Sequence, residues 1–134
     1  MYLRLGGLEY ETHLRDEKLE KKWLRVLSDV LKQLPIDVQT KLQQEVTVLF
    51  AFNNTGEYME SRKKLIYLNC FQMEIMKMPI WAKRYIVAHV FAHAFSGSLD
   101  EKVAISLMEE WGFKDHERYR KWLNIQRYQK QETE

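Results

Sequence analysis

The sequence predicts an α+β fold in which a small β-sheet packs on a central apolar helix, with additional helices around it. Two observations carry this prediction. Residues 46–52 and 64–70 are β-branched and aromatic runs of the kind that form buried strands. Residues 80–95 are apolar on almost every face from Tyr85 onward, which is typical of a helix buried at the centre of a domain.

The composition predicts one domain over residues 1–134. The chain has 134 residues, 46% of them hydrophobic, which is enough for one packed core. The formal net charge of +2 does not by itself predict a polyanionic partner. Cys70 is the single cysteine, so an intramolecular disulfide is excluded. Because no apolar stretch suits a membrane helix or a signal peptide, we expect a cytoplasmic protein with no membrane partner.

The N-terminal region, residues 1–35, contains a predicted amphipathic helix from Asp16 to Leu34. Its apolar residues recur at three- and four-residue steps, as on the buried face of a helix. They are Leu19, Trp23, Val26, Leu27, Val30, Leu31 and Leu34. We expect Asp16 to cap the start of this helix and Pro35 to end it. A shorter helix is expected over residues 36–44, before the first strand.

The two predicted strands are separated by a polar stretch in which residues 53–56 have the composition of a turn. We therefore expect the strands to pair antiparallel across this connection. Residues 3–5 are a candidate for an additional edge strand. A short helical turn is expected within residues 71–78.

Three helices are predicted in the second half of the chain. Pro79 is well suited to open the central helix, and Gly97 is expected to end it. Ser98 and Glu101 have the spacing of a capping box, which predicts a further helix that runs to about Trp111. Residues 114–134 form a C-terminal helix and tail, with a frayed end expected over residues 131–134.

Two histidines interrupt the apolar central helix. His89 and His93 are four residues apart, so on a helix they lie one turn above each other, where both imidazoles can bind one cation. The alternative is a pair of structural histidines hydrogen-bonded inside the core. A pair is harder to satisfy in this way than one histidine, because each neutral ring has a donor and an acceptor to pair.

Glu101 is the candidate third ligand, since a catalytic Zn²⁺ usually takes three protein ligands. Gly97 lies four residues from both His93 and Glu101, so a tight hairpin at Gly97 would place these two side chains opposite each other. The alternative role of Glu101 is to complete the capping box with Ser98. The two roles are compatible.

The segment Tyr85-Ile-Val-Ala-His-Val-Phe-Ala-His-Ala-Phe95 resembles the His-Glu-x-x-His helix of zinc metallopeptidases. The order of the surrounding features is similar to that of small gluzincin-like members of the zincin family. A strand and a short Pro-containing connection precede the helix, and a Glu-x-x-Ala segment with a Trp-Gly-Phe ending follows it. The resemblance covers residues 65–113 and implies a zincin-like fold, with His89, His93 and Glu101 as zinc ligands.

Val90 is the main departure from the family pattern. The resemblance implies that this position normally holds the glutamate that accepts a proton from metal-bound water, and valine cannot do so. We therefore assign no catalytic residue. We expect a metallopeptidase-like domain that lacks efficient peptide hydrolysis and that retains a site for zinc and for a peptide or protein partner.

Two alternative functions are left open by the sequence. One is an active, atypical zinc-dependent hydrolase whose general base is not identifiable from the sequence. The other is nucleic-acid binding by residues 114–130, where six basic residues face two acidic ones with aromatic residues interleaved. Such a segment is more often a terminal helix whose aromatic residues dock on the domain, so nucleic acid is not the expected partner. Cys70 is interpreted as a buried packing residue rather than as an extra soft ligand.

Overall fold

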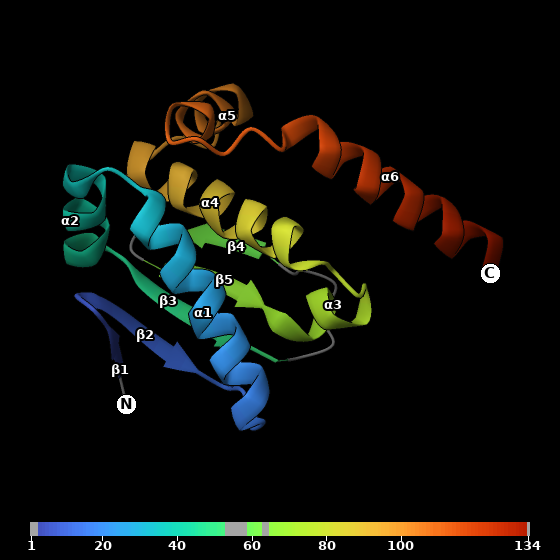
Figure 1. Cartoon of the computed structure of the whole chain (residues 1–134), viewed down its shortest axis with the longest axis horizontal. Coiled ribbons are helices and arrows are strands. Elements are labelled where there is room, and N and C mark those ends of the chain that lie inside the picture. The colour runs from blue at the N-terminus through green and yellow to red at the C-terminus, as the bar shows by residue number, and fades with distance from the viewer. Residues whose placement is uncertain (1–2, 53–58, 63–64, 134) are drawn as a thin grey trace.

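The computed structural model describes residues 3–52, 59–62 and 65–133 and has the predicted α+β class. Its sheet contains five strands in the spatial order β1-β2-β3-β5-β4. The helices α1 and α4 lie side by side over one face of this sheet (Figure 1). The expected packing of the central helix on the sheet is therefore confirmed.

The pairing of the two strands predicted from the sequence differs from expectation. β3 (Thr47–Ala51) and β5 (Leu65–Asn69) are adjacent but parallel, so the antiparallel pairing was wrong. The reason is an additional strand, β4 (Met59–Arg62), which lies between them in the chain and pairs antiparallel with β5 at the edge of the sheet. β4 runs opposite to both β3 and β5, and these two strands are therefore parallel to each other. The turn expected at residues 53–56 lies outside the described residues.

The N-terminal side of the sheet is a hairpin of β1 (Leu3–Leu5) and β2 (Leu8–Thr12). β1 is the outer edge strand, as expected, and β2 joins β3 in parallel. β2 was not predicted from the sequence. Only its alternate residues Leu8 and Tyr10 are apolar and buried, and two such residues are too few to indicate a strand.

The first two helices follow the predicted boundaries closely. α1 (Glu17–Gln33) begins at Asp16, whose carboxylate accepts hydrogen bonds from the backbone N–H groups of residues 18 and 19. Its buried face includes Trp23, Leu27 and Val30, and burial of each such side chain stabilises the fold by about 1.5–3 kcal/mol. Pro35 separates α1 from α2 (Ile36–Glu45), which leads into β3.

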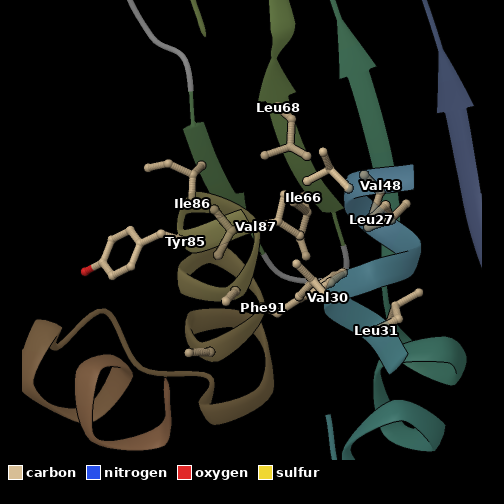
Figure 2. Close-up of a cluster of buried hydrophobic side chains, with 14 of the residues drawn as sticks. Leu27, Val30, Leu31, Val48, Ile66, Leu68, Tyr85, Ile86, Val87 and Phe91 are labelled. Carbon is tan, nitrogen blue, oxygen red and sulfur yellow. The ribbon is translucent and has the colours of Figure 1, made fainter. Parts of the chain in front are cut away.

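The central helix α4 (Ile80–Ser96) follows a short helix, α3 (Cys70–Ile75). It is buried on nearly all sides in its middle section, because it packs on the sheet, on α1 and on α5 (Glu101–Glu110). Figure 2 shows the side chains of Val87 and Phe91 directed toward Val30 of α1 and Ile66 of β5. α4 is therefore held rigidly in the hydrophobic core.

The last helix, α6 (His116–Thr133), follows Gly112, which adopts the positive φ of 94° that ends α5. Its first turns contact α4, and its later turns extend away from the rest of the domain (Figure 1). The helix continues through Thr133, and residue 134 lies outside the described part. None of the described helices combines the length and the hydropathy needed to cross a membrane.

We predict that the Cys70 thiol is unreactive in the folded protein. Its side chain is fully buried at the junction of β5 and α3, and burial raises the pKa of the thiol far above its ordinary range, so the reactive thiolate does not form near neutral pH. A chromogenic thiol reagent at pH 8 should react slowly with native protein and rapidly in denaturant. Rapid reaction with the native protein would contradict the described burial.

Candidate metal centre

The two histidines of α4 are buried and directed at a common point. His89 and His93 are exposed by only 6% and 9%, and their ring centroids are 4.8 Å apart. Their Nε2 atoms are separated by 3.0 Å. The helical spacing thus brings the same nitrogen of both rings together, as the sequence predicts.

Glu101 completes the group from the first residue of α5. Its carboxylate oxygens lie 2.9 Å from Nε2 of His89 and 3.0 Å from Nε2 of His93. The side chain of Glu101 is 63% exposed, so the group lies at the edge of the core and opens toward solvent. The three side chains predicted as ligands are therefore brought together.

The turn between α4 and α5 explains how Glu101 reaches the histidines. Gly97 ends α4 with a φ of 68°, a left-handed conformation that glycine adopts without strain. Asp100, not Ser98, caps α5, because its carboxylate accepts the N–H of Lys102. The capping box expected for Ser98 and Glu101 is therefore wrong, and the carboxylate of Glu101 faces the imidazoles instead.

The tautomer of His93 follows from the hydrogen bond that its Nδ1 atom makes. Nδ1 of His93 lies 2.8 Å from the carbonyl oxygen of Ser98, and a carbonyl oxygen can only accept. Nδ1 therefore carries the hydrogen and donates it, so in the neutral ring the Nε2 atom has a free lone pair. This arrangement, with a backbone carbonyl holding the outer nitrogen, is the one that orients histidine ligands in metal sites.

Burial favours the neutral form of His89, which is the form that binds metals. Burial lowers its pKa, and the nearby imidazoles of His93 and His116 lower it further, against the opposing effect of the Glu101 carboxylate. Its Nδ1 atom is buried and has no hydrogen-bond partner among the described residues.

The facing atoms of the group favour a positive charge between them. The Nε2 lone pair of His93 and the Glu101 carboxylate are both acceptors, yet they are 3.0 Å apart. A shared proton or a metal cation removes this conflict. Two ligands of a tetrahedral Zn²⁺ are about 3.4 Å apart, so small side-chain movements would suffice for coordination. His89, His93 and Glu101 therefore form a group that could hold a metal ion.

Other candidate residues do not join this group. Cys70 does not belong to the group of described residues that could hold a metal ion, and its thiol lies 3.8 Å from the carbonyl oxygen of Leu68. His13 lies on the surface, 3.7 Å from Glu11. Val90 is buried, at 1% exposure, as part of the hydrophobic core.

Tyr85 and His116 are neighbours of the centre that the sequence analysis missed. The Tyr85 hydroxyl is 2.8 Å from Nδ1 of His116, and its ring lies 5.8 Å from that of His89. Tyr85 also stacks on Tyr119, with 4.5 Å between ring centroids. The position of Tyr85 four residues before His89 was a usable signal. No sequence signal indicated His116, because its contact joins α6 to α4.

Comparisons of this protein with protein-family models, with curated proteins and with solved structures found no match. The function is therefore inferred from the geometry of the centre.

We predict that each of the three proposed ligands contributes to zinc affinity. Loss of a residue that only hydrogen-bonds a metal ligand costs about 10–100-fold in affinity. His89→Ala, His93→Ala and Glu101→Ala each remove a proposed ligand itself, so each should weaken zinc binding by more than that. The measurement is competition with a chromogenic chelator at pH 7.5. Glu110→Ala, which removes an exposed carboxylate from the same helix, and His13→Ala are the matched controls. Equal losses in ligand and control variants would exclude this centre as the binding site.

We also predict that Tyr85 makes stability fall at alkaline pH. Burial, with a smaller effect of Glu101, raises the pKa of Tyr85 from 10.0 to about 12. Because the folded-state pKa is the higher one, the stabilisation is complete below pH 10 and is lost as the pH rises toward 12. Denaturant titrations from pH 9 to 12 should show a shallower decline for Tyr85→Phe than for the wild type. Parallel declines would contradict the buried phenol.

Proposed function

We propose that this protein is a zincin-like, zinc-binding domain that does not hydrolyse peptides efficiently and that binds a peptide or protein partner at its metal centre. The observation that carries the proposal is the convergence of His89, His93 and Glu101 on one point. In the resemblance to the His-Glu-x-x-His helix, Val90 stands at the position of the general base.

The donor set favours zinc over the hard divalent cations. Two imidazole nitrogens and one carboxylate are a common zinc set, whereas Mg²⁺ and Ca²⁺ prefer oxygen ligands alone. The outer hydrogen bond from His93 to the Ser98 carbonyl supports the same conclusion, since it presents Nε2 for coordination. When bound, zinc would act as a Lewis acid toward a carbonyl group.

The arrangement of elements also supports the zincin-like interpretation. The helix with both histidines packs on the sheet, and the third ligand comes from the start of the next helix. Because Glu101 is largely exposed, a peptide or protein could reach the centre from solvent.

Among the described residues, the lack of a free carboxylate base beside the proposed ligands supports the loss of hydrolysis. Val90 carries no proton-accepting group, and Asp100 is engaged as the cap of α5. Glu109 and Glu110 lie about two turns further along that helix and are exposed. Loss of a general base costs about 10²–10⁴-fold in rate.

A kinetic comparison tests this proposal. Wild type and Val90→Glu, loaded with equal zinc, are assayed on a broad peptide library. The wild type should show no chelator-sensitive cleavage, and Val90→Glu should gain some, because a carboxylate is restored one residue after the first histidine. The gain is limited by the desolvation of a carboxylate in a core position.

Val90→Gln is the matched control for that comparison, since it introduces the same bulk without a carboxylate. Chelator-sensitive cleavage by the wild type, absent in His93→Ala prepared in parallel, would overturn the proposal that the protein is catalytically silent.

The Tyr85–His116 pair favours a second candidate, an active hydrolase of atypical mechanism. The pair lies beside His89 and carries exchangeable protons at the Tyr85 hydroxyl and the His116 ring. If the wild type cleaves peptides, His116→Ala should abolish cleavage without removing zinc. Unchanged cleavage by His116→Ala would exclude this pair.

A further inference from the structure

A groove lies between α1 and the first turns of α4. It has a volume of about 600 Å³, which is within the range of small-molecule sites. None of the proposed metal ligands lines it. The groove is therefore a feature separate from the candidate metal centre.

Most of the residues that line this groove are basic, and the alkyl parts of their side chains, together with Val26 and Ile80, give it a largely apolar surface bordered by cationic groups. Six cationic side chains and one carboxylate, Asp29, line it. The cationic residues are Lys18, Lys21, Lys22 and Arg25 on α1 and Lys83 and Arg84 on α4. This concentration of charge contrasts with the formal net charge of +2 for the whole chain.

The four α1 cations are available to a ligand. Lys83 pairs with Glu74 at 2.6 Å and Arg84 with Asp29 at 2.8 Å, whereas no ion pair within the described residues involves the cations of α1. Their spacing of three, four and seven residues from Lys18 places them along one face of the helix. They form a row about 10 Å long, since a helix rises about 1.5 Å per residue.

A buried donor also lines the groove. Trp23 is fully buried, and its indole N–H has no hydrogen-bond acceptor among the described residues. The ammonium group of Lys83 lies 5.0 Å from the centre of its ring. Trp23 therefore forms part of the buried wall of the groove.

The start of α4 adds a second favourable element. Its N-cap, Pro79, makes no side-chain capping bond, and the first turn has no acidic residue. Ile80, the first residue of the helix, borders the groove. The unpaired N–H groups and the positive end of the helix dipole therefore favour an anion there.

We propose that this groove binds a small molecule with a chain of phosphate groups, such as a nucleoside triphosphate or inorganic tripolyphosphate. Phosphate oxygens are the acceptors that clustered lysine, arginine and helix N–H donors bind. Trp23 is too buried to stack on a base, so recognition falls on the phosphates rather than on the nucleoside. The limited volume and the low net charge favour a small ligand over a nucleic-acid duplex.

Isothermal calorimetry on metal-free protein at about 0.15 M salt tests the proposal with tripolyphosphate, ATP and a single-stranded oligonucleotide. Tripolyphosphate and ATP should bind with similar affinities. The groove variant Lys21→Gln/Lys22→Gln/Arg25→Gln should lose about tenfold or more in affinity. The matched variant Lys102→Gln/Lys114→Gln/Lys121→Gln, which removes the same charge from exposed positions on α5, on α6 and between them, should lose less than about twofold.

Two single-residue variants test the indole donor and the independence of the groove from the metal centre. Trp23→Phe removes an indole N–H that is too buried to reach a ligand, and it should leave tripolyphosphate binding unchanged. His93→Ala should leave binding unchanged, which separates this site from the metal centre. No binding to the wild type, equal losses in the two triple variants, or tighter binding of the oligonucleotide than of tripolyphosphate would each overturn the proposal.

Discussion

The burial of α4 is the constraint on which the candidate centre depends. The helix packs against the sheet, α1 and α5, so its backbone and side-chain rotamers are held by close packing. His89 and His93 therefore occupy defined positions at the edge of the core, where burial favours the neutral form of His89. A surface helix with the same two residues would leave both rings solvated and free to rotate. Here the hydrophobic core supplies the orientation that metal binding needs.

The turn at Gly97 converts a histidine pair into a three-residue group. The left-handed glycine reverses the chain, and the cap at Asp100 starts α5 so that Glu101 faces α4. The same turn brings the Ser98 carbonyl to Nδ1 of His93 and so sets the tautomer of the ring. One short connection thus provides both the carboxylate that completes the group and the outer hydrogen bond of His93.

The sheet contains features that the sequence pattern did not predict. The strands β3 and β5 were recognised from their apolar runs, but their relative direction depends on the path of the chain between them. β4 supplies the extra reversal, and its sequence does not resemble a buried strand because it lies at the edge of the sheet. β2 was missed for a related reason, since only alternate residues of a half-buried strand are apolar.

The sequence by itself determined the features that depend on neighbours along the chain. Helix periodicity, the cap at Asp16, the ends at Pro35 and Gly97 and the shared face of His89 and His93 all follow from local geometry. The tertiary structure decided the contacts between separate elements: the parallel pairing of β3 and β5, the cap at Asp100, the Tyr85–His116 bond and the basic groove. These contacts depend on how elements pack in three dimensions, and local propensity does not encode that packing.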